Sequence, residues 1–179
     1  AETVPTGGKL IAAGCPARIH LWCNLHGEGV QVLVHNEAAK KGSGPCSVVQ
    51  WVMANGSIHL FAAFSTGKIA SYNVVDGALQ RKAAVSIGVS ILSLVYTDGV
   101  ILVGCADGGL RLIPLRNTTQ FDGKQTLWNG VNNKSAPAIT SIGLSHVPTG
   151  ENETKSICCT GGEDGTVALF ELVRLSNAD

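Results

Sequence analysis

A short segment recurs four times along this chain, and this repeat restricts the possible folds more than any other feature. The two best copies are EDGTVALFEL at 163–172 and ADGGLRLIPL at 106–115. Weaker copies are STGKIASYNV at 65–74 and CPARIHLWCN at 15–24. Each copy starts with turn-forming residues and continues with strand-forming ones. A recurrence of this kind indicates an array of similar units rather than one irregular domain.

Further apolar runs surround each copy and predict a unit of four strands. A small-residue run precedes every copy, another apolar run precedes that one in three of the units, and a more polar run follows three of the copies. The small-residue runs are 9–15, 58–64, 99–105 and 155–162; the earlier runs are 46–53, 89–96 and 138–147; the polar runs are 29–35, 78–85 and 124–129. Four antiparallel strands in about 40–45 residues are typical of a β-propeller blade.

The repeats resemble the WD40 family, and the resemblance extends over essentially the whole chain. It is carried by a turn and the third strand that follows it. The matching residues are Asp164, Thr166, Val167 and Phe170 in the best copy and Asp107, Gly109, Leu110 and Leu112 in the next. Asp accepts backbone N–H groups and Gly tolerates positive φ, so we predict that Asp107 and Asp164 hold these turns. The resemblance implies an all-β propeller of four-stranded antiparallel blades.

The copies also depart from the WD40 pattern. None contains the Trp-Asp dipeptide, and the Gly-His pair that normally opens a repeat is absent. These departures leave the family's buried Asp-His-Ser/Thr-Trp network without its usual residues. Pro16 and Thr66 occupy the Asp position in the two weaker copies. The repeats are degenerate, so the prediction depends on the four copies taken together.

The predicted strands number fourteen, or about three and a half WD40-like blades, within a single segment spanning residues 1–179. The expected blade portions are approximately 8–35, 46–85, 89–129 and 138–175. Fourteen strands are half of a seven-bladed ring, and a half ring leaves two open edges that favour aggregation. We therefore expect the C-terminal half of a larger seven-bladed propeller, or half a ring that another chain completes.

Composition excludes some classes of protein. The chain is 45% hydrophobic and 15% charged, with 13 basic and 13 acidic residues, which argues against disorder and against a strongly basic nucleic-acid surface. No apolar run approaches the roughly 18 residues that a membrane-spanning helix needs. Cysteines within or beside the apolar runs are expected to be buried free thiols. Four N-x-S/T sequons, at Asn55, Asn117, Asn133 and Asn152, keep a secreted protein open as an alternative to a cytoplasmic or nuclear one.

Motifs for chemistry are weak. Cys15, His20, Cys23 and His26 suggest a zinc site, but eight residues of extended strand separate the two cysteines by about 26 Å. The stretch 40–47 has Gly-x-Gly beside two lysines but lacks the spacing of a phosphate-binding loop. No Ser/His/Asp order or paired carboxylates stand out. We therefore expect no enzyme activity, no metal and no cofactor.

The remaining candidate is a binding surface. In a propeller of this kind the turns between second and third strands lie on one face together with the loops between blades. We expect Lys40, Lys41 and Lys134 to place positive charge there and Trp128 to serve as an aromatic anchor for a partner.

The sequence thus predicts a non-catalytic protein–protein interaction scaffold, a WD40-like module within a multiprotein assembly. The alternatives are an RNA-binding propeller subunit of a ribonucleoprotein and a secreted or surface receptor-binding propeller. The sequence does not identify the partner.

Overall fold

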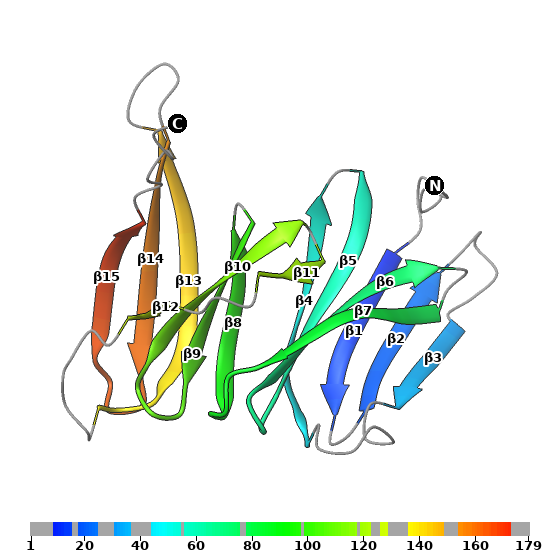
Figure 1. The fold of residues 1–179 in the computed structure, drawn as a ribbon, viewed down its shortest axis with the longest axis horizontal. Helices are drawn as coiled ribbons and strands as arrows, with labels where there is room; N and C mark the ends of the chain where they lie inside the picture. Colours follow the sequence, from blue (N-terminus) through cyan, green and yellow to red (C-terminus); the bar gives the residue numbers. More distant parts are fainter. Residues whose placement is uncertain are drawn as a thin grey trace.

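The strands form four antiparallel sheets that follow one another in chain order, side by side in a row (Figure 1). The computed structural model describes residues 9–15, 18–24, 31–36, 44–54, 56–75, 78–97, 99–117, 119–122, 126–128, 136–148 and 154–172. The predicted propeller arrangement is confirmed, and the described residues contain no helix.

Consecutive strands pair in each sheet, except that β12 of the third sheet pairs with β10 instead of β11. The first sheet contains β1 (Lys9–Cys15), β2 (Arg18–Asn24) and β3 (Gln31–Asn36). The second contains β4 (Cys46–Ala54), β5 (Ser57–Phe64), β6 (Lys68–Val75) and β7 (Ala78–Ser86). The third contains β8 (Ile91–Thr97), β9 (Val100–Cys105), β10 (Leu110–Asn117), β11 (Gln120–Phe121) and β12 (Thr126–Trp128). The fourth contains β13 (Ile139–Pro148), β14 (Thr154–Gly162) and β15 (Val167–Leu172).

The second sheet shows how the sequence pattern produces a blade. The middle strands β5 and β6 are mostly apolar. β5 is buried along most of its length and β6 over residues 69–72, because a neighbouring sheet covers each face. The outer strand β7 alternates between exposed and half-buried residues, as its polar sequence predicts. Gly67 ends the β5–β6 turn at a φ of 82°, a conformation that side chains of L-residues rarely adopt.

Three apolar clusters hold the four sheets together. The first joins the first and second sheets around Ile19, Leu60 and Tyr72. The next joins the second and third sheets and includes Phe61, which stacks on Tyr96 with ring centroids 6.1 Å apart. The last joins the third and fourth sheets. The core is therefore a series of layers between sheets rather than one central mass.

The third sheet contains a strand that the sequence pattern did not predict. The polar run 124–129 was expected to be the whole outer strand, but β11 and β12 both pair with β10, so the described strands number fifteen. The cause is a turn directly after β10, where Asn117 Oδ1 accepts hydrogen bonds from the backbone N–H groups of Thr119 (3.0 Å) and Gln120 (2.9 Å). This turn returns the chain to β10 earlier than expected.

The distance predicted between Cys15 and Cys23, which argued against a zinc site, was wrong. Cys15 and Cys23 do not lie on one strand, because β1 and β2 form a hairpin. In its register Cys15 pairs with Arg18 and Cys23 pairs with Leu10, so the two positions are five residues apart along the sheet. At about 3.3 Å per residue this is still roughly 16 Å, far beyond the reach of one metal ion.

Candidate interaction surface

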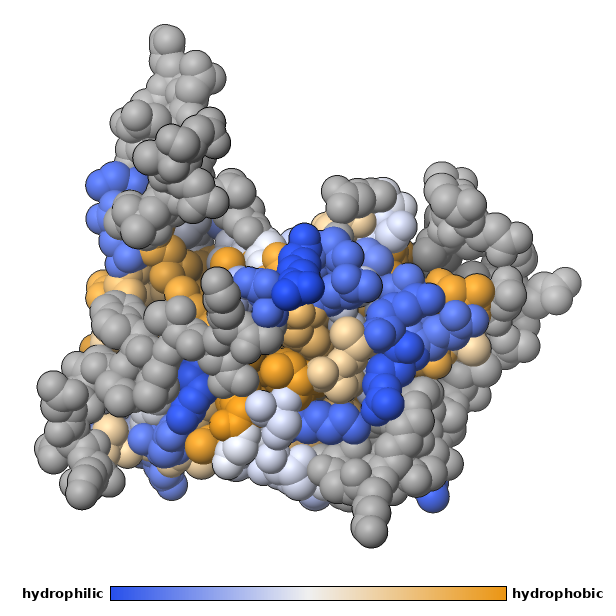
Figure 2. All heavy atoms as spheres, in the orientation of Figure 1, coloured by the Kyte–Doolittle hydropathy of each residue, from blue (hydrophilic) through white to orange (hydrophobic). Residues whose placement is uncertain are grey.

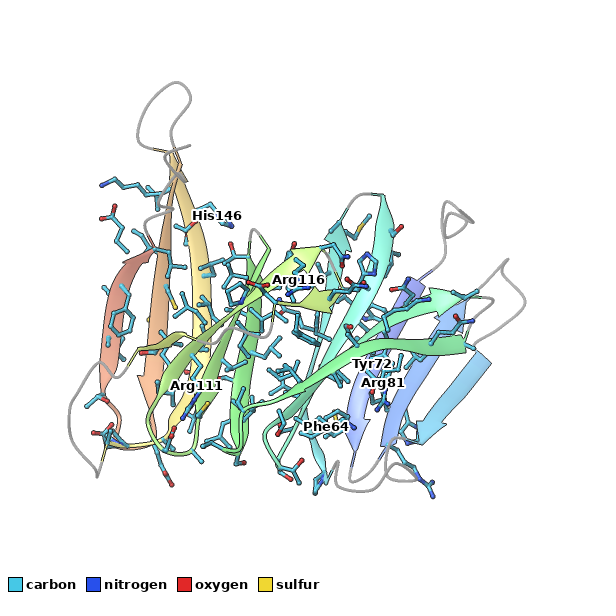
Figure 3. All side chains as sticks on the ribbon, viewed as in Figure 1. Phe64, Tyr72, Arg81, Arg111, Arg116 and His146 are labelled. Carbon is cyan, nitrogen blue, oxygen red and sulfur yellow. The ribbon has the colours of Figure 1, made fainter. Side chains whose placement is uncertain are left out.

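Asp107 organises the turn between β9 and β10. Its Oδ1 accepts a hydrogen bond from the backbone N–H of Gly109 (3.0 Å), while the Gly108 N–H donates to the carbonyl of Cys105 (3.1 Å). The guanidinium of Arg111 donates to both carboxylate oxygens, with Nη1–Oδ1 and Nη2–Oδ2 distances of 2.9 and 2.6 Å. Such a two-pronged contact is the strongest form of Arg–carboxylate pairing. Figure 3 shows Arg111 near the end of the sheet where β9 turns into β10.

This pair perturbs the ionisable groups around it. The hydrogen bonds from Arg111 hold the pKa of Asp107 below its usual value, and those to Asp107 raise the pKa of Arg111. The Arg111 side chain is buried, with 10% of its surface exposed, whereas the Asp107 side chain is 43% exposed. Burial raises the pKa of the nearby Cys105 thiol. Because its pKa is lowered, the Asp107 carboxylate stays ionised, and it accepts hydrogen bonds from the turn and from Arg111. It is therefore poorly suited to donate a proton.

Asp164 makes the matching turn between β14 and β15. Its Oδ1 accepts hydrogen bonds from the backbone N–H of Thr166 (3.0 Å) and from the Thr166 hydroxyl (2.6 Å). The Gly165 N–H donates to the carbonyl of Gly162 (3.1 Å), as Gly108 does in the other turn. The Thr166 donors lower the pKa of Asp164. Ala168 stands where the other copy has Arg111, so this carboxylate has no matching ion pair.

The fourth sheet has one covered face and one exposed face. On the covered face Leu144, Cys158 and Phe170 pack toward Leu102 and Leu110 of the third sheet. On the opposite face the register aligns Ser141 with Gly161 and Val167, and Cys159 with Leu169. We call this exposed side the terminal face and define it by four residues: Ser141, Gly161, Val167 and Leu169.

The terminal face exposes large apolar side chains. Val167 and Leu169 are 70% and 71% exposed. An ion pair between Lys155 and Glu171 (3.0 Å) lies at one end of the same face. Figure 2 shows apolar side chains over β14 and β15 at this end of the row of sheets. Two large aliphatic side chains side by side on one face of a strand are unusual for a surface that only water contacts.

The repeat shows what normally covers this position. The residues equivalent to Val167 in the other three copies are Ile19, Ile69 and Leu110, which are 0%, 0% and 2% exposed. In each case the next sheet along the chain covers the side chain. Val167 is therefore exposed because of where its sheet lies, although its residue type suits a buried position.

The hydrogen-bonding edge of β15 is also different. The third strands β2, β6 and β10 each pair with a strand on both sides. β15 pairs with β14 alone among the strands that the structure describes. The fourth sheet thus combines an apolar face with an unpaired strand edge.

The structure does not test the four residues predicted to bind a partner. Lys40, Lys41 and Lys134 lie outside the described residues. Trp128 ends β12, where its backbone pairs with Leu110 in the third sheet. Their joint role in partner binding stays a prediction. Sequence reasoning missed the terminal face, because an apolar third strand looks the same whether or not a neighbouring sheet covers it.

Two buried polar side chains, His59 and Ser71, are hydrogen-bonded within the fold. His59, 5% exposed, is hydrogen-bonded through Nδ1 to Asn73 Oδ1 on the neighbouring strand (2.9 Å). The buried Ser71 hydroxyl donates to the carbonyl of Thr119 (2.7 Å), which links the second and third sheets. The described residues contain no group of three His, Cys, Asp or Glu side chains placed to hold a metal ion. They also include no helix with the length and apolar character to cross a membrane.

Comparisons with known proteins find likeness in structure and none in sequence. No family model matches the chain, and no curated protein matches it. A crystal structure of Sqt1 from Saccharomyces cerevisiae, a WD40 protein, is 17% identical and superposes with a TM-score of 0.70 over 97% of this chain and 44% of Sqt1. The crystal structure of the computationally designed protein Ika4 is 16% identical, with a TM-score of 0.60 over 92% of this chain and 86% of Ika4. The chain thus spans less than half of Sqt1, and at this identity the likeness concerns the fold.

Proposed function

We propose that this chain is a non-catalytic protein–protein interaction scaffold, a WD40-like propeller module of a multiprotein assembly. The observation that carries the proposal is the terminal face, where Val167 and Leu169 are about 70% exposed on a sheet whose other face is buried. Contiguous exposed apolar side chains on a folded sheet mark surfaces that another protein covers.

Two further features support a protein partner. The free edge of β15 offers backbone groups that a partner strand can pair with, which is a common way of binding a protein segment. The fold is also shared with a WD40 protein, Sqt1. Propellers present rigid surfaces on which loops and blade faces are held in fixed positions. We place the module in the cytoplasm or nucleus, with other proteins as its partners.

The absence of catalysis is part of the proposal. The described carboxylates with shifted pKa values, Asp107 and Asp164, are both engaged in turns. The described buried thiols Cys105 and Cys158 have pKa values raised by burial, which disfavours the reactive thiolate. We assign these carboxylates and thiols a structural role, and we assign partner binding to the terminal face.

The proposal can be tested in cells that express the protein. The tagged chain and the double variant V167D/L169D would be chemically crosslinked and purified, and the attached proteins quantified. We expect the wild type to recover specific proteins at a fixed ratio to itself, and these can include further copies of the chain. The double variant should recover markedly less of them. M53D is the matched control, because Met53 is 77% exposed on β4, away from the terminal face.

Two outcomes would contradict the scaffold. If the wild type and V167D/L169D recover the same proteins in equal amounts, the terminal face is not the binding surface. If recovery depends on RNA and disappears after nuclease treatment, the alternative of an RNA-binding propeller replaces the scaffold. Retention on a polyanion resin that falls steeply with salt would support that alternative.

A further inference from the structure

We propose that the terminal face binds the first sheet of a second copy of this chain, and that two such contacts close a ring of eight sheets. The inference rests on the proposed function, because it takes the terminal face as a protein-binding surface and names its occupant. It is argued from how the sheets already pack on one another within one chain.

The first argument is a glycine that no neighbouring sheet of the described residues approaches. Gly14, Gly104 and Gly161 occupy the same position in three repeats. A Cβ atom at Gly14 would lie 2.7 Å from Cys46 Sγ, and one at Gly104 would lie 2.5 Å from Ile139 Cγ2, so both glycines admit the next sheet. A Cβ atom at Gly161 would meet only the hydroxyl of Ser141 in its own sheet. The fourth sheet thus keeps the residue that permits close approach of a further sheet.

The turn glycines repeat this contrast. A Cβ atom at Gly67 would come within 2.5 Å of the Val89 carbonyl oxygen, and one at Gly108 within 2.5 Å of Ala136 Cβ. Both clashes are with the segment that leads into the next sheet. Gly165 has the same left-handed φ, 83°, but a Cβ atom there would meet nothing within 4 Å. The turn therefore has room for the segment that precedes another sheet.

A serine on the first strand of the sheet shows the same contrast between the third and fourth sheets. Ser93 follows the bulge in β8, and its hydroxyl donates to the carbonyl of Ile139 in the next sheet (3.3 Å). Ser141 follows the equivalent bulge in β13 and is exposed. The terminal face therefore has equivalents of the serine, the close-approach glycine and the apolar third-strand residue that the third sheet uses to bind its neighbour.

The chain carries the complementary surface at its other end. Within the chain, the first two strands of each following sheet cover the third-strand position, as β13 and β14 cover Leu110. The first sheet begins with the equivalent of such a strand, β1, and among the described strands no sheet lies beyond it at that end of the row (Figure 1). In the repeat, Ile11 and Ala13 stand where β9 has Ile101 and Val103. Both halves of one contact are thus present on one chain.

The geometry of the contact decides the assembly. Two different surfaces that bind each other produce either a closed ring or an open filament. The sheets of this chain already lie side by side in a propeller arrangement (Figure 1). Two chains of four sheets each would give a ring of eight sheets, which is within the usual range of about four to eight propeller blades. Two copies would form a seven-bladed ring only if their end sheets merged, and each end sheet here already has three strands of its own.

The test is the mass of the purified 179-residue chain in solution, measured by sedimentation velocity over a range of concentrations. We expect a species of twice the 18.5 kDa chain mass at micromolar concentration. L169D should raise the dissociation constant of this dimer at least roughly tenfold, because it places a charge at the core of the interface. M53D should leave the dissociation constant unchanged. Circular dichroism of each variant, taken where it is monomeric, checks that it is folded.

Three outcomes would overturn the second-copy proposal. They are a chain that stays monomeric at high micromolar concentration, an open series of larger oligomers, and a dimer that L169D leaves intact. A monomer whose terminal face binds a different protein in the crosslinking experiment overturns this inference but leaves the scaffold proposal standing. Equal recovery of all proteins with the terminal-face variant would instead count against the scaffold itself.

Discussion

The turn between β9 and β10 and the turn between β14 and β15 share their local chemistry but not their surroundings. In both, an Asp carboxylate accepts the backbone N–H two residues ahead, and the glycine after it has a φ near 80°, 74° at Gly108 and 83° at Gly165. The residue that begins the following strand is nevertheless 2% exposed at Leu110 and 70% exposed at Val167. A neighbouring sheet covers the first and not the second.

The comparison separates two contributions to the fold. The turn geometry depends on residues two to four positions apart, so the same sequence signal produces it in both copies. Burial depends on a sheet more than twenty residues further along the chain, which the last copy does not have in the described residues. Substitutions at equivalent positions therefore measure how much stability the neighbouring sheet contributes.

The largest difference is expected between L110A and V167A. Truncating Leu110 leaves a cavity between the third and fourth sheets, so the free energy of unfolding should fall by about 2–5 kcal/mol. Truncating Val167 removes surface that is already in water, and the change should stay within about 0.5 kcal/mol. Urea unfolding measures both at low protein concentration, where copies of the chain are apart. Equal losses for the two variants would mean that Val167 is buried in the folded monomer.

A smaller contrast is expected between G104A and G161A. Both new methyl groups meet a serine hydroxyl of their own sheet, Ser93 or Ser141, which can rotate away. Only the methyl group at Gly104 also meets Ile139, including its backbone oxygen at 2.8 Å. Overpacking of this kind should lower the free energy of unfolding by about 1–3 kcal/mol, whereas G161A should change it by less than about 0.5 kcal/mol.

The two glycine variants, G104A and G161A, also test the proposed dimer. Under the second-copy proposal G161A should weaken association although it leaves the monomer stable. G104A should do the reverse, destabilising the monomer without acting at the interface directly. A G161A chain that is as stable as the wild type and associates equally well would show that no sheet approaches Gly161.

The fold was predictable from the sequence because propeller strands are local features. The turn residues Asp107 and Asp164 and the apolar third strands repeat, and all strands except β12 pair with their neighbours along the chain. The extra strand β11 was not predictable in the same way. It depends on the Asn117 side chain, which closes a turn directly after β10.

The candidate surface was less predictable. The lysines and Trp128 were chosen by residue type and by expected loop positions, and the structure does not test their role. Val167 and Leu169 have the same apolar character as residues that are buried in the other copies. A half ring was expected to have two open edges, and the structure shows that Val167 and Leu169 lie at one of them, on the last described sheet of the row (Figure 1). Exposure of this kind is set by what is missing beside a residue, which no local pattern records.

The third contrast compares D107A with D164A. Removing the Asp107 carboxylate leaves the buried guanidinium of Arg111 without its partner, so the free energy of unfolding should fall by about 1–3 kcal/mol. Removing the Asp164 carboxylate leaves the Thr166 N–H and hydroxyl free to bond with water, because this turn is exposed. We expect a smaller loss for D164A in the same urea measurement. A greater loss for D164A would show that the turn matters more than the ion pair.

The smallest effect concerns pH and compares the wild type with D107N. The pKa of Asp107 in the folded chain lies below its usual value, chiefly because Arg111 donates hydrogen bonds to it. The stability that this shift contributes is therefore fully present above the unfolded pKa of about 4, and it is lost as the pH falls through the folded pKa. Asparagine cannot ionise, so D107N lacks this contribution at every pH.

The difference in unfolding free energy between the wild type and D107N should accordingly be constant from neutral pH to about 5, and it should shrink toward zero in stronger acid. The corresponding difference for D164N should be smaller throughout, because the partners of Asp164 are uncharged donors. Urea unfolding at a series of pH values measures both curves. A D107N difference that persists unchanged in strong acid would show that Asp107 stabilises the turn through its shape and hydrogen-bonding atoms rather than through its charge beside Arg111.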